Sequence, residues 1–105
     1  MNIQLSTDKH IEGSEPMAEH VRTVIKKHLA HFEDKISRVE VHLGDENGGK
    51  TGQKDQRCMM EARPKGFDPI VVTELAPSMH QAIEGAAERL RRTLTSHFEK
   101  LDAHR

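Results

Sequence analysis

The apolar stripe between residues 79 and 101 is the sequence feature that most constrains the fold of this chain. When residues are placed at intervals of about 100°, its members share one side of a helix: Met79, Ile83, Ala86, Ala87, Leu90, Leu94, Phe98 and Leu101. Ser78 and Gln81 match a capping box that starts a helix, and Pro77 discourages an earlier start. A helix of about 24 residues is roughly 36 Å long and must pack its apolar side against other elements.

A second amphipathic stripe predicts a helix that begins after Ser14 and ends near Asp34. Ser14 is a good cap residue, and Pro16 is tolerated in the first helical turn. The apolar side of this helix is formed by Met17, Val21, Val24, Ile25, His28, Leu29 and Phe32.

Alternating apolar and polar residues predict strands with one buried face in three segments. These segments cover residues 1–6, 38–43 and 57–63, and the residues expected to face the core are Met1, Ile3, Leu5, Val39, Val41, Leu43, Cys58, Met60 and Ala62. Because a full-length helix separates the first two strands, we expect these strands to be parallel, with a right-handed connection.

A fourth strand is predicted for residues 70–75, after a turn over residues 64–69. Pro69 at its start is typical of an edge strand. An apolar run this short does not decide which face is buried, because a shift of one residue exchanges the two faces. We expect Ile70 and Val72 to face the core. In the alternative register the buried residues are Val71, Thr73 and Leu75.

The segment from Gly44 to Gln56 has several glycines and no apolar residue, which predicts a flexible hairpin loop between the second and third strands. The order of elements is then β-α-β-β-β-α. This order predicts an α+β fold in which a four-stranded mixed sheet has both helices packed on one face. A length of 105 residues is typical of a single domain.

Composition limits the partners of the protein. The formal net charge is −1, whereas general attraction to nucleic acid shows as a basic excess, so any RNA binding must depend on a local patch. No apolar run approaches the length of a membrane span and the N-terminus lacks a signal segment, so we expect no membrane association. The single cysteine, Cys58, cannot form an intramolecular disulfide, and it fits a small core residue in a cytoplasmic protein.

A line of cations along one flank of the C-terminal helix is the best candidate for a working surface. It consists of Arg89, Arg92 and Lys100, with Ser96 between the last two. Arginine forks onto phosphate oxygens and lysine acts as a point charge, so such a line can contact RNA. The alternative is a merely solvated face, because Glu88 lies within one turn of Arg91 and Arg92, and Glu84 lies one turn before Glu88.

Further cations and histidines are expected to extend this line. Arg22, Lys26 and Lys27 on the first helix are expected to join it across the helical layer. His97 and His104 lie near its end and would gain charge as the pH falls towards about 6.5. The residues predicted to contact RNA are Arg22, Lys26, Lys27, Arg89, Arg92, His97 and Lys100.

Metal binding and catalysis have little support in the sequence. His28 and His31 have a spacing that can place two imidazoles on one side of a helix, but His28 lies on the apolar stripe. No cysteine pair or acidic cluster has ligand spacing. Gly48 and Gly49 do not open a helix and no phosphate-loop lysine follows them. We therefore expect no metal, no cofactor, no small-molecule substrate and no enzymatic activity.

The chain resembles the short form of the ribosome hibernation-promoting factors, relatives of the ribosome-associated inhibitor proteins. The order of elements agrees over the full length, and residues 1–7 and the segment with Phe32, Lys35 and Ile36 also fit. The most specific match lies in the C-terminal helix, at Met79, Ala82, Ile83, Glu84, Gly85, Glu88, Arg89, Leu90, Arg92, Leu94, Thr95, His97, Lys100 and Leu101. The order β-α-β-β-β-α is also close to that of double-stranded RNA-binding domains.

This resemblance implies that the protein binds the small ribosomal subunit, through its rRNA, in the channel for messenger and transfer RNA. It would silence idle ribosomes there, without a cofactor and without catalysis. It would be monomeric off the ribosome, and it would resemble the short members that lack the ribosome-pairing C-terminal domain. The competing hypothesis is a protein-interaction module that kept the fold and lost the ribosome.

Overall fold

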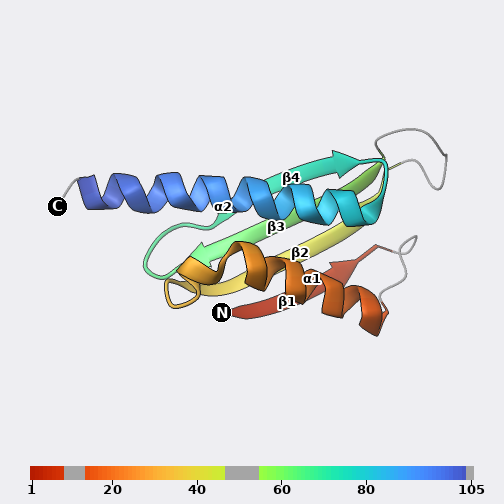
Figure 1. Ribbon diagram of the computed structural model, residues 1–105, viewed down its shortest axis with the longest axis horizontal. Coiled ribbons are helices and arrows are strands. Elements are labelled where there is room, and N and C mark those ends of the chain that lie inside the picture. The colour runs from red at the N-terminus through yellow and green to blue at the C-terminus, as the bar shows by residue number, and fades with distance from the viewer. Residues whose placement is uncertain (9–13, 47–54, 104–105) are drawn as a thin grey trace.

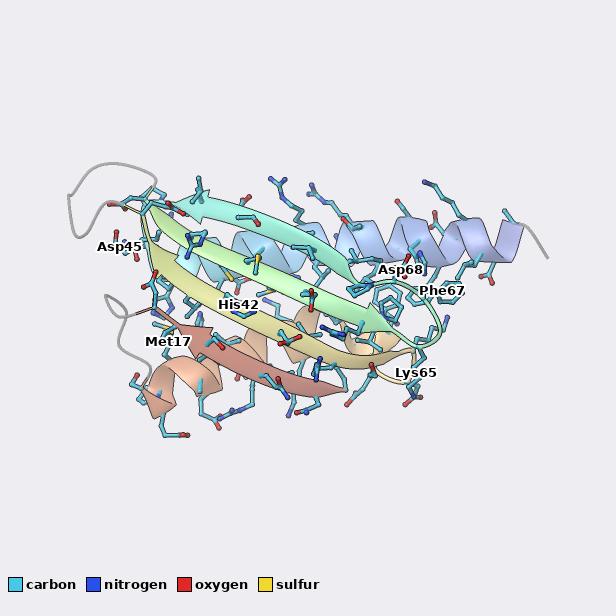
Figure 2. All side chains as sticks on the ribbon, turned by 180° about the vertical axis from the view of Figure 1, so that it is seen from behind. Met17, His42, Asp45, Lys65, Phe67 and Asp68 are labelled. Atoms are coloured by element: carbon cyan, nitrogen blue, oxygen red, sulfur yellow. The ribbon has the colours of Figure 1, made fainter. Side chains whose placement is uncertain are left out.

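The computed structural model describes residues 1–8, 14–46 and 55–103. One sheet has both helices on the same face, and the other face of the sheet is open to solvent (Figures 1 and 2). The elements follow the order β-α-β-β-β-α, with a short 3-10 turn after the first helix. The predicted α+β fold is therefore confirmed.

The sheet has the strand order β1-β2-β3-β4. Its strands are β1 (Asn2–Thr7), β2 (Ile36–Asp45), β3 (Gln56–Pro64) and β4 (Ile70–Ala76). β1 pairs with β2 in parallel, and the other neighbouring pairs are antiparallel. The predicted parallel pairing and the edge position of the fourth strand are both confirmed.

The fourth strand buries the face that we expected. Val72 and Ala76 are buried and Ile70 is partly buried, whereas Val71 and Leu75 are exposed. Because β4 is an edge strand with helices on one side only, its alternation separates a core face from a face open to solvent.

The first helix is shorter than its apolar stripe suggested. α1 spans Glu15–His28, and the Ser14 hydroxyl accepts a hydrogen bond from the Met17 amide at 3.2 Å. Leu29 leaves the helical conformation at φ −109° and ψ 19°, so the α-helix ends there and not near Asp34. A 3-10 turn, η1 (Ala30–Phe32), carries the chain on towards β2, which explains why the apolar spacing continued.

The second helix, α2 (Met79–Ala103), begins directly after its cap. The Ser78 hydroxyl accepts a hydrogen bond from the Gln81 amide at 3.2 Å and donates to the Gln81 side-chain oxygen at 3.1 Å. Both contacts of the capping box therefore use the Ser78 hydroxyl, which binds the backbone amide and the side-chain oxygen of Gln81. The last turns of α2 project beyond the end of the sheet, and the molecule is elongated, with extents of 50 × 25 × 21 Å (Figure 1).

The core between sheet and helices is aliphatic. Its buried members include Val39, Met60, Ile83, Leu90 and Leu94, and no phenylalanine is among the buried core residues. Cys58 is fully buried, as expected for a small core residue, and burial raises the pKa of its thiol to about 12. The described helices include none that is long and apolar enough to span a membrane.

The hairpin between β2 and β3 is tighter than the predicted loop from Gly44 to Gln56. Both strands run further, with Asp45 opposite Gln56 and the Glu46 amide bonded to the Asp55 carbonyl at 2.8 Å. Gly44 lies opposite Arg57, and a side chain at position 44 would collide with the Arg57 guanidinium. The strand therefore continues through a glycine that the sequence suggested as a loop residue. Residues 47–54, where the rest of the predicted loop falls, lie outside the described residues.

Candidate nucleic-acid interface

The predicted cation line occupies exposed positions of α2. Arg89 reaches β4, where its guanidinium donates to the Glu74 carboxylate at 2.9 Å. Arg92 lies further outward, with 73% of its side chain exposed, and its Nε contacts Glu88 at 3.2 Å. Lys100 is exposed and makes no ion pair within the described part of the chain. The line is accessible, although its arginines already have carboxylate partners.

Arg22 of α1 does not join this line. His20 and His28 of α1 make side-chain contacts with α2, to His80 and Glu84. Arg22 follows His20 by two positions, which is about 200° around the helix, so it lies on the far flank. It pairs there with Glu19 at 3.2 Å and with Glu15 at 3.8 Å. Lys26 and Lys27 are exposed and have no ion pair among residues 1–8, 14–46 and 55–103.

Carboxylates and histidines occupy the seam between the two helices. His28 contacts Glu84 through Nε2 at 2.9 Å and Glu88 through Nδ1 at 3.4 Å. Glu88 also accepts hydrogen bonds from Arg91 and Arg92. The bond from Arg91, helped by the charges of Arg91, Arg92 and His28, lowers the pKa of Glu88 to about 2. The glutamates are thus used for helix pairing, which supports the structural interpretation of part of this charge.

A histidine pair closes the other end of the seam. His80 Nδ1 lies 3.0 Å from His20 Nε2, and the ring centroids are 4.2 Å apart. Burial and the neighbouring His80 lower the pKa of His20, so its neutral form is favoured. The described residues contain no group of three or more His, Cys, Asp or Glu side chains placed to hold a metal ion.

His97 is not part of the cation line. Its ring makes edge contacts with Phe67 and Phe98, each at 5.0 Å between centroids. Its Nε2 atom is inaccessible and has no hydrogen-bond partner among the described groups. The ring therefore supports an aromatic cluster on the side of α2 that faces the sheet end.

All three phenylalanines of the chain gather in this cluster, at the end where α2 projects beyond the sheet. Phe32 stacks on Phe98 at 5.3 Å between centroids, and Lys35 Nζ lies 4.9 Å from the centre of the Phe98 ring. Phe67 belongs to the turn between β3 and β4 and is 49% exposed (Figure 2).

A pocket of about 490 Å³ opens beside the cluster. It is lined by Asp34, Lys35, Lys65, Phe67, Phe98, Leu101 and Asp102. Sequence reasoning missed this pocket because its walls come from three segments that are distant in the chain. The sequence feature that could have indicated the pocket is Phe67, an aromatic residue in an otherwise polar turn.

The open face of the sheet carries a balanced ion-pair network instead of a basic patch. Arg38 lies directly opposite Arg63, and Glu40 lies directly opposite Glu61 (Figure 2 shows this face). Glu40 pairs with Arg38 at 3.3 Å and with Arg63 at 3.2 Å. A hydrogen bond with Glu61, followed by the charges of Arg38 and Arg63, lowers the pKa of Glu40. This face therefore has little surplus charge for phosphates.

Comparison with protein families gives one match over nearly the whole chain. Residues 5–102 match the family described as "Sigma 54 modulation protein / S30EA ribosomal protein". A comparison with curated proteins gives no match.

Two solved structures share the fold. The N-terminal domain of Protein Y from Thermus thermophilus is 18% identical, with a TM-score of 0.72, and the match covers 92% of this chain and 99% of that one. A ribosomal subunit interface protein from Coxiella burnetii is 15% identical, with a TM-score of 0.68, and the match covers 94% of this chain and 99% of that one. At these identities the likeness concerns the arrangement of helices and strands.

Proposed function

The chain belongs to the sigma 54 modulation protein / S30EA ribosomal protein family, whose members bind the small ribosomal subunit and inhibit translation, and from this membership we propose that the protein silences idle ribosomes. It does so by occupying the messenger and transfer RNA channel of the small subunit, as a monomer and without chemistry. The observation that carries this proposal is the family match over residues 5–102.

The outer side of the helical layer is the proposed RNA-contacting surface. Lys26, Lys27 and Lys100 can meet phosphates without first losing a protein partner, because none of them has an ion pair within the described residues. Arg89 and Arg92 must exchange a carboxylate for a phosphate, which reduces their net contribution. We therefore expect the three lysines to carry more of the electrostatic affinity than the arginines.

Co-sedimentation with small subunits over a series of salt concentrations tests this proposal. Each phosphate contact releases condensed cations, so it adds about 0.7 to 0.9 to the slope of log affinity against log salt. Replacing Lys26, Lys27 and Lys100 with alanine should lower that slope by about 2 to 3.

The matched control replaces the same lysines with arginine. Charge is kept, so the slope should stay close to that of the wild-type protein. Equal slopes for the alanine and arginine variants would exclude these lysines as phosphate contacts. Absence of binding to small subunits at low salt would instead support a protein-interaction module that no longer binds ribosomes.

A further inference from the structure

We propose that the pocket beneath the projecting end of α2 binds one unpaired RNA nucleotide, with its base stacked on Phe67 and its phosphate near Lys65. The proposal rests on the proposed function for the source of the RNA, which is the rRNA of the small subunit. It adds a base-contacting site to the surface proposed to meet RNA phosphates.

The aromatic residues of the chain are concentrated beside this pocket. The chain has no tryptophan or tyrosine, and its three phenylalanines meet at this one end, where Phe32 and Phe98 pack against the edge of the core and Phe67 is exposed. A fold whose core is filled by aliphatic side chains does not need an exposed aromatic ring on a turn. Stacking on aromatic side chains is a common way for proteins to hold unpaired bases.

The ring that is open to a ligand is that of Phe67. Phe98 already stacks on Phe32 and has the Lys35 ammonium above its ring, whereas Phe67 is 49% exposed. The His97 ring contacts Phe67 nearly at a right angle, with an interplanar angle of 83°. His97 therefore acts as a positioning residue that supports the Phe67 ring from one side.

The turn that carries Phe67 is held in place before any ligand arrives. The Lys65 amide bonds to the Lys35 carbonyl at 3.0 Å, and the Phe67 amide bonds to the Pro64 carbonyl at 3.2 Å. Gly66 between them has a φ of 82°, a conformation that favours glycine. A preformed turn reduces the entropy that binding must overcome.

The size and the charges of the pocket fit a nucleotide. Its volume of about 490 Å³ lies within the range of small-molecule sites. Lys65 is exposed and makes no ion pair in the described parts of the chain, so its ammonium can take a phosphate. The Asp34 carboxylate, which also lines the pocket, can accept a hydrogen bond from the amino group of a base. An apolar side chain of a protein partner would use only the ring and leave Lys65 and Asp34 without a role.

Small-subunit binding by Phe67→Ala gives the first test. Loss of one stacked base should weaken binding by about 5-fold to 150-fold, with an unchanged salt slope, because stacking releases no counterions. Lys65→Ala should lower the slope by about 0.7 to 0.9. The matched control is Val71→Ala, which removes an equally exposed apolar side chain, at 51%, from the open sheet face and should bind like the wild-type protein.

A second measurement does not depend on the ribosome. The four ribonucleoside 5′-monophosphates are titrated while NMR follows the aromatic resonances of Phe67 and Phe98 in the full chain. Saturable shifts at Phe67 and Phe98, with the Phe98 shifts lost in Phe67→Ala, are the expected result. They would support the pocket even if wild-type protein failed to bind small subunits, an outcome that would overturn only the proposed function.

Two results would overturn the inference. One is equal small-subunit binding by Phe67→Ala and Val71→Ala when the wild-type protein binds. The other is the absence of nucleotide-induced shifts at Phe67, which would mean that any loss of affinity in Phe67→Ala reflects a protein partner in the pocket.

Discussion

Leu90 shows how strongly single residues of the α2 stripe support the fold. Its side chain is fully buried between the helix and the sheet. Leu90→Ala removes buried methyl groups and leaves a cavity, so it should lower the free energy of unfolding by about 2 to 5 kcal/mol. Chemical denaturation followed by circular dichroism measures this change. An unfolding midpoint equal to that of the wild-type protein would show that position 90 is not packed.

Glu88 gives a pH-dependent prediction at the residue scale. Its pKa falls from an ordinary value of 4.5 to about 2 because Arg91, Arg92 and His28 favour the charged carboxylate. A carboxylate with a depressed folded-state pKa stabilises the protein above pH 4.5, and this contribution is lost as the pH falls towards 2.

Comparing Glu88→Gln with the wild-type protein tests this assignment. The variant should be the less stable protein near neutral pH, and the difference should shrink as the pH is lowered from 4.5 to 2. Glu99→Gln is the matched control, because Glu99 is an exposed residue of the same helix with no ion pair among the described residues. A difference that is constant with pH would show that Glu88 stabilises the helices by packing alone.

At this scale the sequence predicted buried residues well and contact partners poorly. Spacing alone placed Leu90 and Cys58 in the core, because helix and strand periods fix the direction of a side chain. The same rule would have placed His97 on the apolar side, since it lies three residues after Leu94 and four before Leu101. Its polar character suggested the cation line instead. The partner of Arg89, Glu74, comes from another element and has no signal in the spacing.

Each helix begins at a serine whose hydroxyl binds a backbone amide of the first turn. Ser78→Ala leaves the Gln81 amide without that partner, so it should destabilise the protein by about 1 kcal/mol. Thermal unfolding of Ser78→Ala against Ser96→Ala separates capping from the general effect of removing a hydroxyl, because Ser96 is an exposed interior position of the same helix. A larger loss in Ser96→Ala would contradict the capping role.

The starts of the elements were more predictable than their ends. Caps and prolines mark where a helix can begin, whereas α1 ended at Leu29 although apolar spacing continued to Phe32. Likewise β2 extended through Gly44, because Gly44 still pairs with Arg57 of β3 and its missing side chain leaves room for the Arg57 guanidinium. Such limits depend on neighbours across the sheet, which composition and periodicity do not report.

On the scale of the whole molecule, the near-neutral net charge makes the position of each charge decisive for RNA binding. Glu99→Gln and Gln4→Lys each raise the net charge by one. The first change lies on α2, and the second lies on the open face of β1. If RNA lies over the helices, Glu99→Gln should tighten small-subunit binding by about 2-fold to 5-fold at low salt.

Gln4→Lys should change that affinity less, because its charge lies on the opposite face of the molecule. Equal gains from the two substitutions would mean that only total charge matters. A larger gain from Gln4→Lys would place the RNA on the sheet face. Both affinities come from the same co-sedimentation assay.

The gathering of every phenylalanine at one end also separates the optical signals of the molecule. Without tryptophan or tyrosine, the near-ultraviolet dichroism of the folded chain arises chiefly from Phe32, Phe67 and Phe98. That spectrum therefore reports the order of the projecting end, while far-ultraviolet dichroism reports the helices and the sheet. The chain carries an internal reporter with which loosening of this end can be followed separately from global unfolding, without an added label.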